Sequence, residues 1–163
     1  MSKGFVATKI NWNIITRWAR LSLPNGQIAH SAWKETAMKT NPQIARMVKL
    51  RHQNNDHFAE IHFYFCFPTN GQFKTLTLMS LFGEPDRDLL QHSQETLVVC
   101  EYRGNTALLM VEITQIVAVV AVPPLPKTYN IPSMDTKQLH YVVEKPGLDI
   151  LHIGGHNEED IDE

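Results

Sequence analysis

From Phe58 onward the chain alternates apolar and polar residues in short runs, the pattern of half-buried β-strands. The run FAEIHFYFCFP begins at Phe58 and is crowded with aromatic residues, and TLTLMSLF alternates Thr and Ser with Leu and Met. Residues 68–71 (PTNG) predict a hairpin turn between them, because Asn and Gly tolerate positive φ. TLVVCEY, TALLMVEI, IVAVVAV and LHYVVEK predict four more strands, the first two joined by a turn at residues 103–105. Short strands at this spacing predict a mainly β fold with short helices, as a small antiparallel β-barrel or sandwich.

Two short helices are expected beside these strands. In GEPDRDLLQHS, Asp86 can cap a helix that carries Leu89 and Leu90. In SAWKETAMK, Ser31 can cap another, just after a turn at Pro24-Asn25-Gly26. The preceding run, NWNIITRWARLSL, fits a helix or an extended arm, and its pattern leaves both open.

A chain of 163 residues fits one domain with tails. We expect a basic, Trp-containing N-terminal segment over residues 1–40, a β-barrel-like domain over 41–153, and a disordered acidic tail over 154–163. Cys66 and Cys100 lie within apolar runs and are expected to be buried free thiols, which favours a reducing, intracellular compartment. The longest apolar run, beginning at Ile116, is too short to span a bilayer, so no membrane association is expected.

Charge is distributed unevenly along the chain. Residues 1–53 contain nine Lys and Arg against one acid, Glu35, although the net charge of the whole chain is −2. All three tryptophans fall in the same third, and basic residues interleaved with aromatic ones are typical of nucleic-acid binding. The candidate nucleic-acid-binding residues are Lys9, Trp12, Arg17, Trp18, Arg20, Lys34, Lys39, Arg46, Lys49 and Arg51.

The same features also have a purely structural interpretation. The basic and acidic halves would then neutralise each other in the fold, and the indoles would pin the N-terminal segment onto the barrel. Trp33, at the start of the first predicted helix, is the indole that fits this second interpretation best.

Motifs for catalysis or metal binding are fragmentary. Ser31 and Lys34 match the Ser-x-x-Lys of penicillin-recognising enzymes, but the Ser-Asp-Asn and Lys-Thr-Gly elements that this chemistry also needs do not occur. His52, His57 and His62 recur every five residues, which suits neither one helix face nor one strand face. No glycine-rich phosphate loop or nucleophile elbow is present. We therefore expect no enzyme, no metal, no cofactor and no small-molecule substrate.

Several phrases of the chain resemble a known protein class. LPNGQIAHSAWKE, ARMVKL, TLMSLFGEPDRDLLQHSQETLVVCEYRG, ITQIVAVVAVPP and VVEKPGLDI occur in this order over about residues 20–150. They resemble the tail of large mushroom-fungus proteins of the CACTA (En/Spm-like) transposase class, in which a phrase close to LPNGQ-ARS-WKE recurs. The resemblance implies an accessory domain of a mobile element, without the RNase H-like catalytic core that lies upstream in such proteins. One departure is His30, where the class has Arg, so a phosphate contact at this position would be weaker and dependent on pH.

The order of elements is also similar to SH3-like and bromo-adjacent-homology (BAH) modules, with an aromatic-rich strand first and a Val/Ile run before prolines. Together the resemblances and the basic segment imply a nuclear, non-enzymatic module, derived from a transposase accessory domain, that binds DNA or a chromatin protein. The alternative is a protein–protein or self-association domain without a nucleic-acid role, in which the IVAVVAV and HFYFCF strands pair at sheet edges to form a homo-oligomer.

Overall fold

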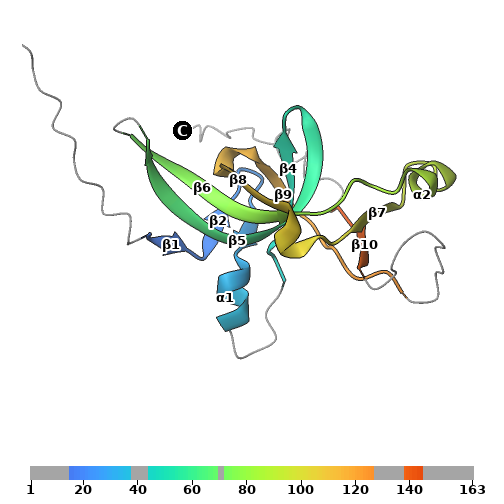
Figure 1. Cartoon of the computed structure of the whole chain (residues 1–163), viewed down its shortest axis with the longest axis horizontal. Helices are drawn as coiled ribbons and strands as arrows, with labels where there is room; N and C mark the ends of the chain where they lie inside the picture. The colour runs from blue at the N-terminus through green and yellow to red at the C-terminus, as the bar shows by residue number, and fades with distance from the viewer. Residues whose placement is uncertain (1–14, 38–43, 70–71, 127–137, 145–163) are drawn as a thin grey trace, which may run out of the picture.

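A computed structural model describes residues 15–37, 44–69, 72–126 and 138–144 of the chain. These residues form antiparallel sheets with two short α-helices, which confirms the prediction of a mainly β fold (Figure 1). In chain order the elements are β1 (Arg17–Trp18), β2 (Arg20–Ser22), β3 (Ile28–His30), α1 (Ala32–Ala37), β4 (Met47–His52), β5 (Asn55–Thr69), β6 (Gln72–Leu81), α2 (Arg87–His92), β7 (Val98–Glu101), the 3-10 helix η1 (Gly104–Ala107), β8 (Leu108–Glu112), the 3-10 helix η2 (Ile113–Gln115), β9 (Ile116–Val119) and β10 (Leu139–Val142).

The main sheet is built around the long strand β5, which Figure 1 shows running beside β6 through the middle of the molecule. Its strand order is β8-β6-β5-β4-β9, and β1 pairs with the second half of β5. β4 and β5 form a hairpin whose two-residue loop, Gln53-Asn54, has φ values of 51° and 66°. A loop with both central residues at positive φ matches the right-handed twist of the strands on either side. The predicted hairpin of β5 and β6 is confirmed by their antiparallel pairing, with Thr69 opposite Gln72.

The main sheet is strongly curled. β8 and β9 are its two outer strands, yet η2 joins them with only three residues. Three residues of 3-10 helix advance about 6 Å. In a flat sheet the outer two of five strands would be about 19 Å apart. The sheet must therefore bend until its edges approach, which encloses the core of Val48, Ile61, Tyr64 and Met79. The strands do not pair into a closed barrel within the described residues.

A second, two-stranded sheet of β7 and β10 lies against one end of the curl. Isolated bridges link it to the main sheet at Phe82–Tyr102 and at Ala121–Val143. The predicted turn at residues 103–105 was expected to fold TALLMVEI back onto TLVVCEY, and this prediction is wrong. After β7 the chain passes through η1 and enters β8, which pairs with β6 in the other sheet. β7 and β8 do not form a hairpin, because β7 pairs with β10 and β8 pairs with β6.

The hairpin of β2 and β3 covers the outer edge of β9. Gly26, at φ +79°, makes the turn that the Pro-Asn-Gly tripeptide predicts. The Asn25 side chain donates to the carbonyl of Val117 (3.1 Å). Gln27 bonds both the N–H (2.7 Å) and the carbonyl (3.2 Å) of Val119. These side chains form hydrogen bonds with backbone groups of β9 that could otherwise pair with a further strand.

The segment before β4 belongs to the same core as the sheet. Leu23 and Ala29, from the β2–β3 hairpin, pack with Val48 and Ile61. Residues 17–22 are extended, which settles the open choice between a helix and an arm for this part of the run. The predicted boundary at residue 40 and the acidic tail at 154–163 lie outside the described residues.

Both predicted helix caps are present. The Asp86 carboxylate accepts a hydrogen bond from the N–H of Leu89, at the start of α2. The Ser31 hydroxyl accepts one from the N–H of Lys34, at 3.4 Å, at the start of α1. The Asp86 cap satisfies an N–H that the first helical turn leaves free, whereas the Lys34 N–H also bonds the Ser31 carbonyl at 3.1 Å.

Candidate functional site

Arg17 lies between two aromatic rings on the outer face of the main sheet. Its guanidinium carbon is 4.8 Å from the ring centroid of Trp33, on α1, and 5.6 Å from that of Phe63, on β5. The register of β1 against β5 sets this position, because it places Arg17 opposite Phe65, two residues beyond Phe63. Residues two apart on a strand share a face of the sheet. We call Arg17, Trp33 and Phe63 the stacked cluster.

Helix α1, which carries Trp33, is held by a buried carboxylate. Glu35 is only 3% exposed and accepts a hydrogen bond from the N–H of Ala45 at 2.7 Å. Arg46 donates to the other oxygen of the same carboxylate, also at 2.7 Å. Trp33 is 45% exposed. The indole also contacts the Arg17 guanidinium of β1, so it contributes to holding α1 while part of its surface stays open to a ligand.

Two further cations lie beside the stacked cluster. Lys34 follows Trp33 on α1, and Arg20 follows β1 at the start of β2. The two segments are joined by a backbone hydrogen bond from Ser31 to the carbonyl of Ala19, at 3.0 Å. Within the described residues neither Arg20 nor Lys34 forms an ion pair, and Arg17 contacts only rings. None of these three cations has a carboxylate partner among the described residues.

Trp18 is not part of this group. It follows Arg17 in β1 and pairs with Tyr64, which is buried in the core, so its side chain belongs to the opposite face of the sheet. Trp18 is 39% exposed there. Two exposed indoles that are close in sequence therefore serve different surfaces.

Arg46 is occupied by two buried carboxylates. It donates to Glu35, as described, and to Glu60 on β5 at 2.6 Å. Burial alone would lower the pKa of Arg46, but the hydrogen bonds to Glu35 and Glu60 outweigh it, so that the pKa is raised. The Tyr102 hydroxyl donates to the other oxygen of Glu60. Arg46 is thus part of an internal network that ties α1, β5 and β7 together, and it is not available to phosphate.

Lys49 and Arg51, on β4, are also neutralised. Lys49 bonds both Asp56 (3.2 Å) and Glu144 (3.0 Å), and Arg51 bonds Asp56 (2.9 Å). The hydrogen bond from Arg51, helped by Lys49, lowers the pKa of Asp56. The cations of β4 are therefore paired with carboxylates.

The other sequence predictions fall outside the site. Lys9, Trp12 and Lys39 lie outside the described residues. His30 is half-buried, and its Nδ1 is 3.5 Å from Glu35, so it faces the internal network rather than phosphate. Phe63 was not singled out from the sequence. The only feature of the sequence that could have indicated Phe63 is its place among the aromatic residues of β5.

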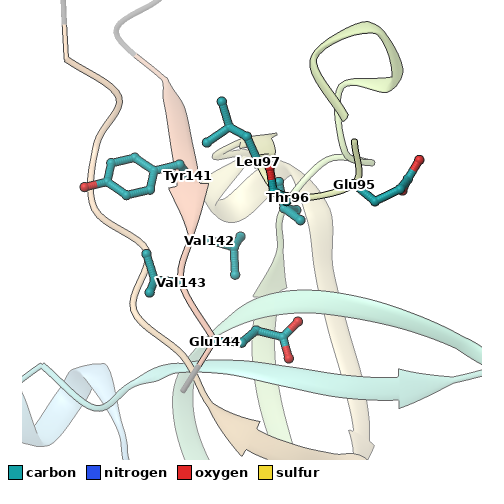
Figure 2. Close-up of a pocket in the computed structure, with 8 residues that line it drawn as sticks. Glu95, Thr96, Leu97, Tyr141, Val142, Val143 and Glu144 are labelled. Carbon is teal, nitrogen blue, oxygen red and sulfur yellow. The ribbon is translucent and has the colours of Figure 1, made fainter. Parts of the chain in front are cut away.

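A cavity of about 420 Å³ lies where β7 and β10 diverge. Figure 2 shows Val142 between Leu97 and Glu144, with Glu95 at the margin. The cavity is lined by polar and apolar side chains in similar measure, and the Glu144 carboxylate is bound to Lys49. None of the candidate nucleic-acid-binding residues lines it.

The histidines and helices add little to the site. Within the described residues no three His, Cys, Asp or Glu side chains gather as a metal site would require, and neither helix is long and apolar enough to cross a membrane. The His52 ring accepts or donates to Gln115, and His62 pairs with Ser80. These histidines serve contacts within the sheet.

Comparison of the chain with known protein families, with curated proteins and with solved structures finds no match.

Proposed function

We propose that this protein is a non-enzymatic nucleic-acid-binding module that contacts phosphate through Arg17, Arg20 and Lys34. The observation that carries the proposal is the division among the basic residues. Arg46, Lys49 and Arg51 are held by carboxylates, whereas the three cations named above are not. Unpaired cations next to exposed aromatic rings suit a ligand that is both anionic and aromatic.

The resemblance to a transposase tail supports DNA as the nucleic acid, and it supports a nuclear location. A chromatin protein as the partner fits the site less well, because the exposed rings would then need a matching aromatic or cationic surface. Self-association through the strands expected at sheet edges is also less well supported. β5 is paired on both sides, and the outer edge of β9 is bonded by Asn25 and Gln27.

The proposal is tested by measuring binding of a labelled DNA oligonucleotide as a function of salt concentration. Each phosphate contact lowers the slope of log K against log salt by about 0.7 to 0.9. Arg17→Ala, Arg20→Ala and Lys34→Ala should therefore each weaken binding and make this slope shallower.

Arg51→Ala is the matched control. Arg51 is exposed like Arg17, but its charge is already paired with Asp56. Its removal should leave the affinity and the salt slope nearly unchanged. If the protein binds no nucleic acid at low salt, or if Arg51→Ala weakens binding as much as Arg17→Ala does, the proposed site is wrong.

A further inference from the structure

We infer that the stacked cluster takes an unpaired strand of nucleic acid, with a base stacked on the outer face of the Trp33 indole. This inference rests on the proposed function and names the form of nucleic acid that the site selects. It follows from how the rings, the cations and α1 are arranged.

In the stacked cluster a guanidinium contacts two aromatic rings, and a further planar group could stack on the Trp33 ring. The Arg17 guanidinium occupies the gap between Trp33 and Phe63. One face of the indole is thus covered by a cation, and the residue is still 45% exposed. Bases stack on aromatic side chains regardless of their sequence, because every base has a π-face. A base on the outer face of Trp33 would continue the order of ring, cation and ring that the protein already has.

The apolar surface continues from the cluster across the sheet. Phe63 pairs with Leu78 on β6, and Leu78 pairs with Met110 on β8. Residues directly opposite each other in neighbouring strands share one face. Met110 is 57% exposed, so this row offers apolar contact to a base next to the stacked one. The charge on the row is supplied at its α1 end, by Lys34 and Arg20.

Double-stranded DNA fits this arrangement poorly. In a duplex the bases stack on one another, and only their edges are presented in the grooves. Reading those edges takes an element that enters a groove, commonly a helix. Helix α1 has only six residues, about 9 Å in length, and Glu35 fixes it against the body of the protein. An outer sheet face with an exposed indole therefore favours bases whose faces are free.

The test compares one labelled oligonucleotide, single-stranded, with the same sequence annealed to its complement. We expect the single strand to bind at least tenfold more tightly than the duplex at equal salt. Trp33→Ala should weaken single-strand binding roughly tenfold, since one stacked base is lost. Trp33→Phe should retain most of the affinity, because a smaller ring can still stack.

Trp18→Ala is the control, since it removes an exposed indole of similar accessibility from the other face of the sheet. It should leave single-strand affinity unchanged. Far-ultraviolet circular dichroism of each variant checks that the fold is intact, and a Trp33→Ala variant that is unfolded is replaced by Trp33→Leu, which keeps an apolar side chain without a ring.

The outcomes separate the inference from the proposed function. A duplex that binds as tightly as the single strand, with the Arg17 and Lys34 variants weakened and the Trp33 variants unaffected, overturns the inference and leaves the proposed function standing. Absence of any nucleic-acid binding removes both. Dimerisation that Trp33→Ala abolishes, measured by sedimentation equilibrium without nucleic acid, also overturns the inference, because a second copy would then be the ligand of this face.

Discussion

Glu35 is a buried charged residue that joins helix α1 to the chain before β4. It is buried on a six-residue helix and satisfies both the Ala45 N–H and one side of the Arg46 guanidinium. A carboxylate in this position holds α1, and with it Trp33, at a fixed place on the sheet. The position of the candidate site thus depends on a residue that no ligand would touch.

Replacing this carboxylate should destabilise the protein strongly. Glu35→Ala leaves the Ala45 N–H without its partner and removes one of the two carboxylates of Arg46, so we expect a loss of about 3 kcal/mol in the free energy of unfolding. Urea denaturation measures it. Thr36→Ala, an exposed change on the same helix, should cost about 0.5 kcal/mol or less. Equal effects of the two variants would show that the Glu35 network contributes little.

The β2–β3 hairpin shows how an element can protect an edge with side chains. Gln27 bonds the N–H and the carbonyl of Val119, which are backbone groups at the outer edge of β9. Gln27→Ala leaves both groups without these partners. We expect a cost of about 1 to 2 kcal/mol and faster hydrogen exchange at the Val119 amide. Ser22→Ala, an exposed change in the same hairpin, should alter neither quantity. Unchanged exchange at Val119 in the Gln27 variant would refute the edge-capping role.

Strands with a two-residue period and both helix caps could be predicted from the sequence, because these signals are local. β4 was missed although Val48 and Leu50 alternate with Lys49 and Arg51, because its cations were assigned to phosphate rather than to the outer face of a strand. The pairing of β7 and β8 was mispredicted because strand partners depend on contacts distant in sequence. For the same reason the sequence could show an excess of cations but not which of them are paired.

At the scale of the whole molecule, the uneven charge had two interpretations, mutual neutralisation of the two halves and a basic binding surface. Each agrees with a different set of the basic residues. Carboxylates of the acidic body, Glu60, Asp56 and Glu144, neutralise the cations of residues 46–51. The cations of residues 17–34 receive no such partner among the described residues. Neutralisation of the cations of residues 46–51 leaves the unpaired positive charge on the segment that also carries the exposed indole of Trp33.

The enclosed core also sets how the stability of the molecule depends on pH. Burial, helped by Glu84, raises the pKa of Cys100 to about 12 from 9.0. Burial and the hydrogen bond to Glu60 raise the pKa of Tyr102 to about 12 from 10.0. Burial alone raises the pKa of Tyr64. Burial would lower the pKa of Lys49, but its hydrogen bonds to Glu144 and Asp56 outweigh this effect and raise the pKa. All four groups therefore keep their protons longer in the folded state than in the unfolded chain.

Their contribution to stability should be fully present below about pH 9 and should be lost as the pH rises toward about 12, because the unfolded chain releases these protons first. Urea denaturation between about pH 8 and about pH 11 should show a free energy of unfolding that falls steadily. Tyr102→Phe removes one of the four groups, so its decline should be shallower than that of the original protein, even though it loses the hydrogen bond to Glu60 at every pH. Parallel curves for the two proteins would contradict the prediction, because they would mean that folding does not raise the pKa of Tyr102.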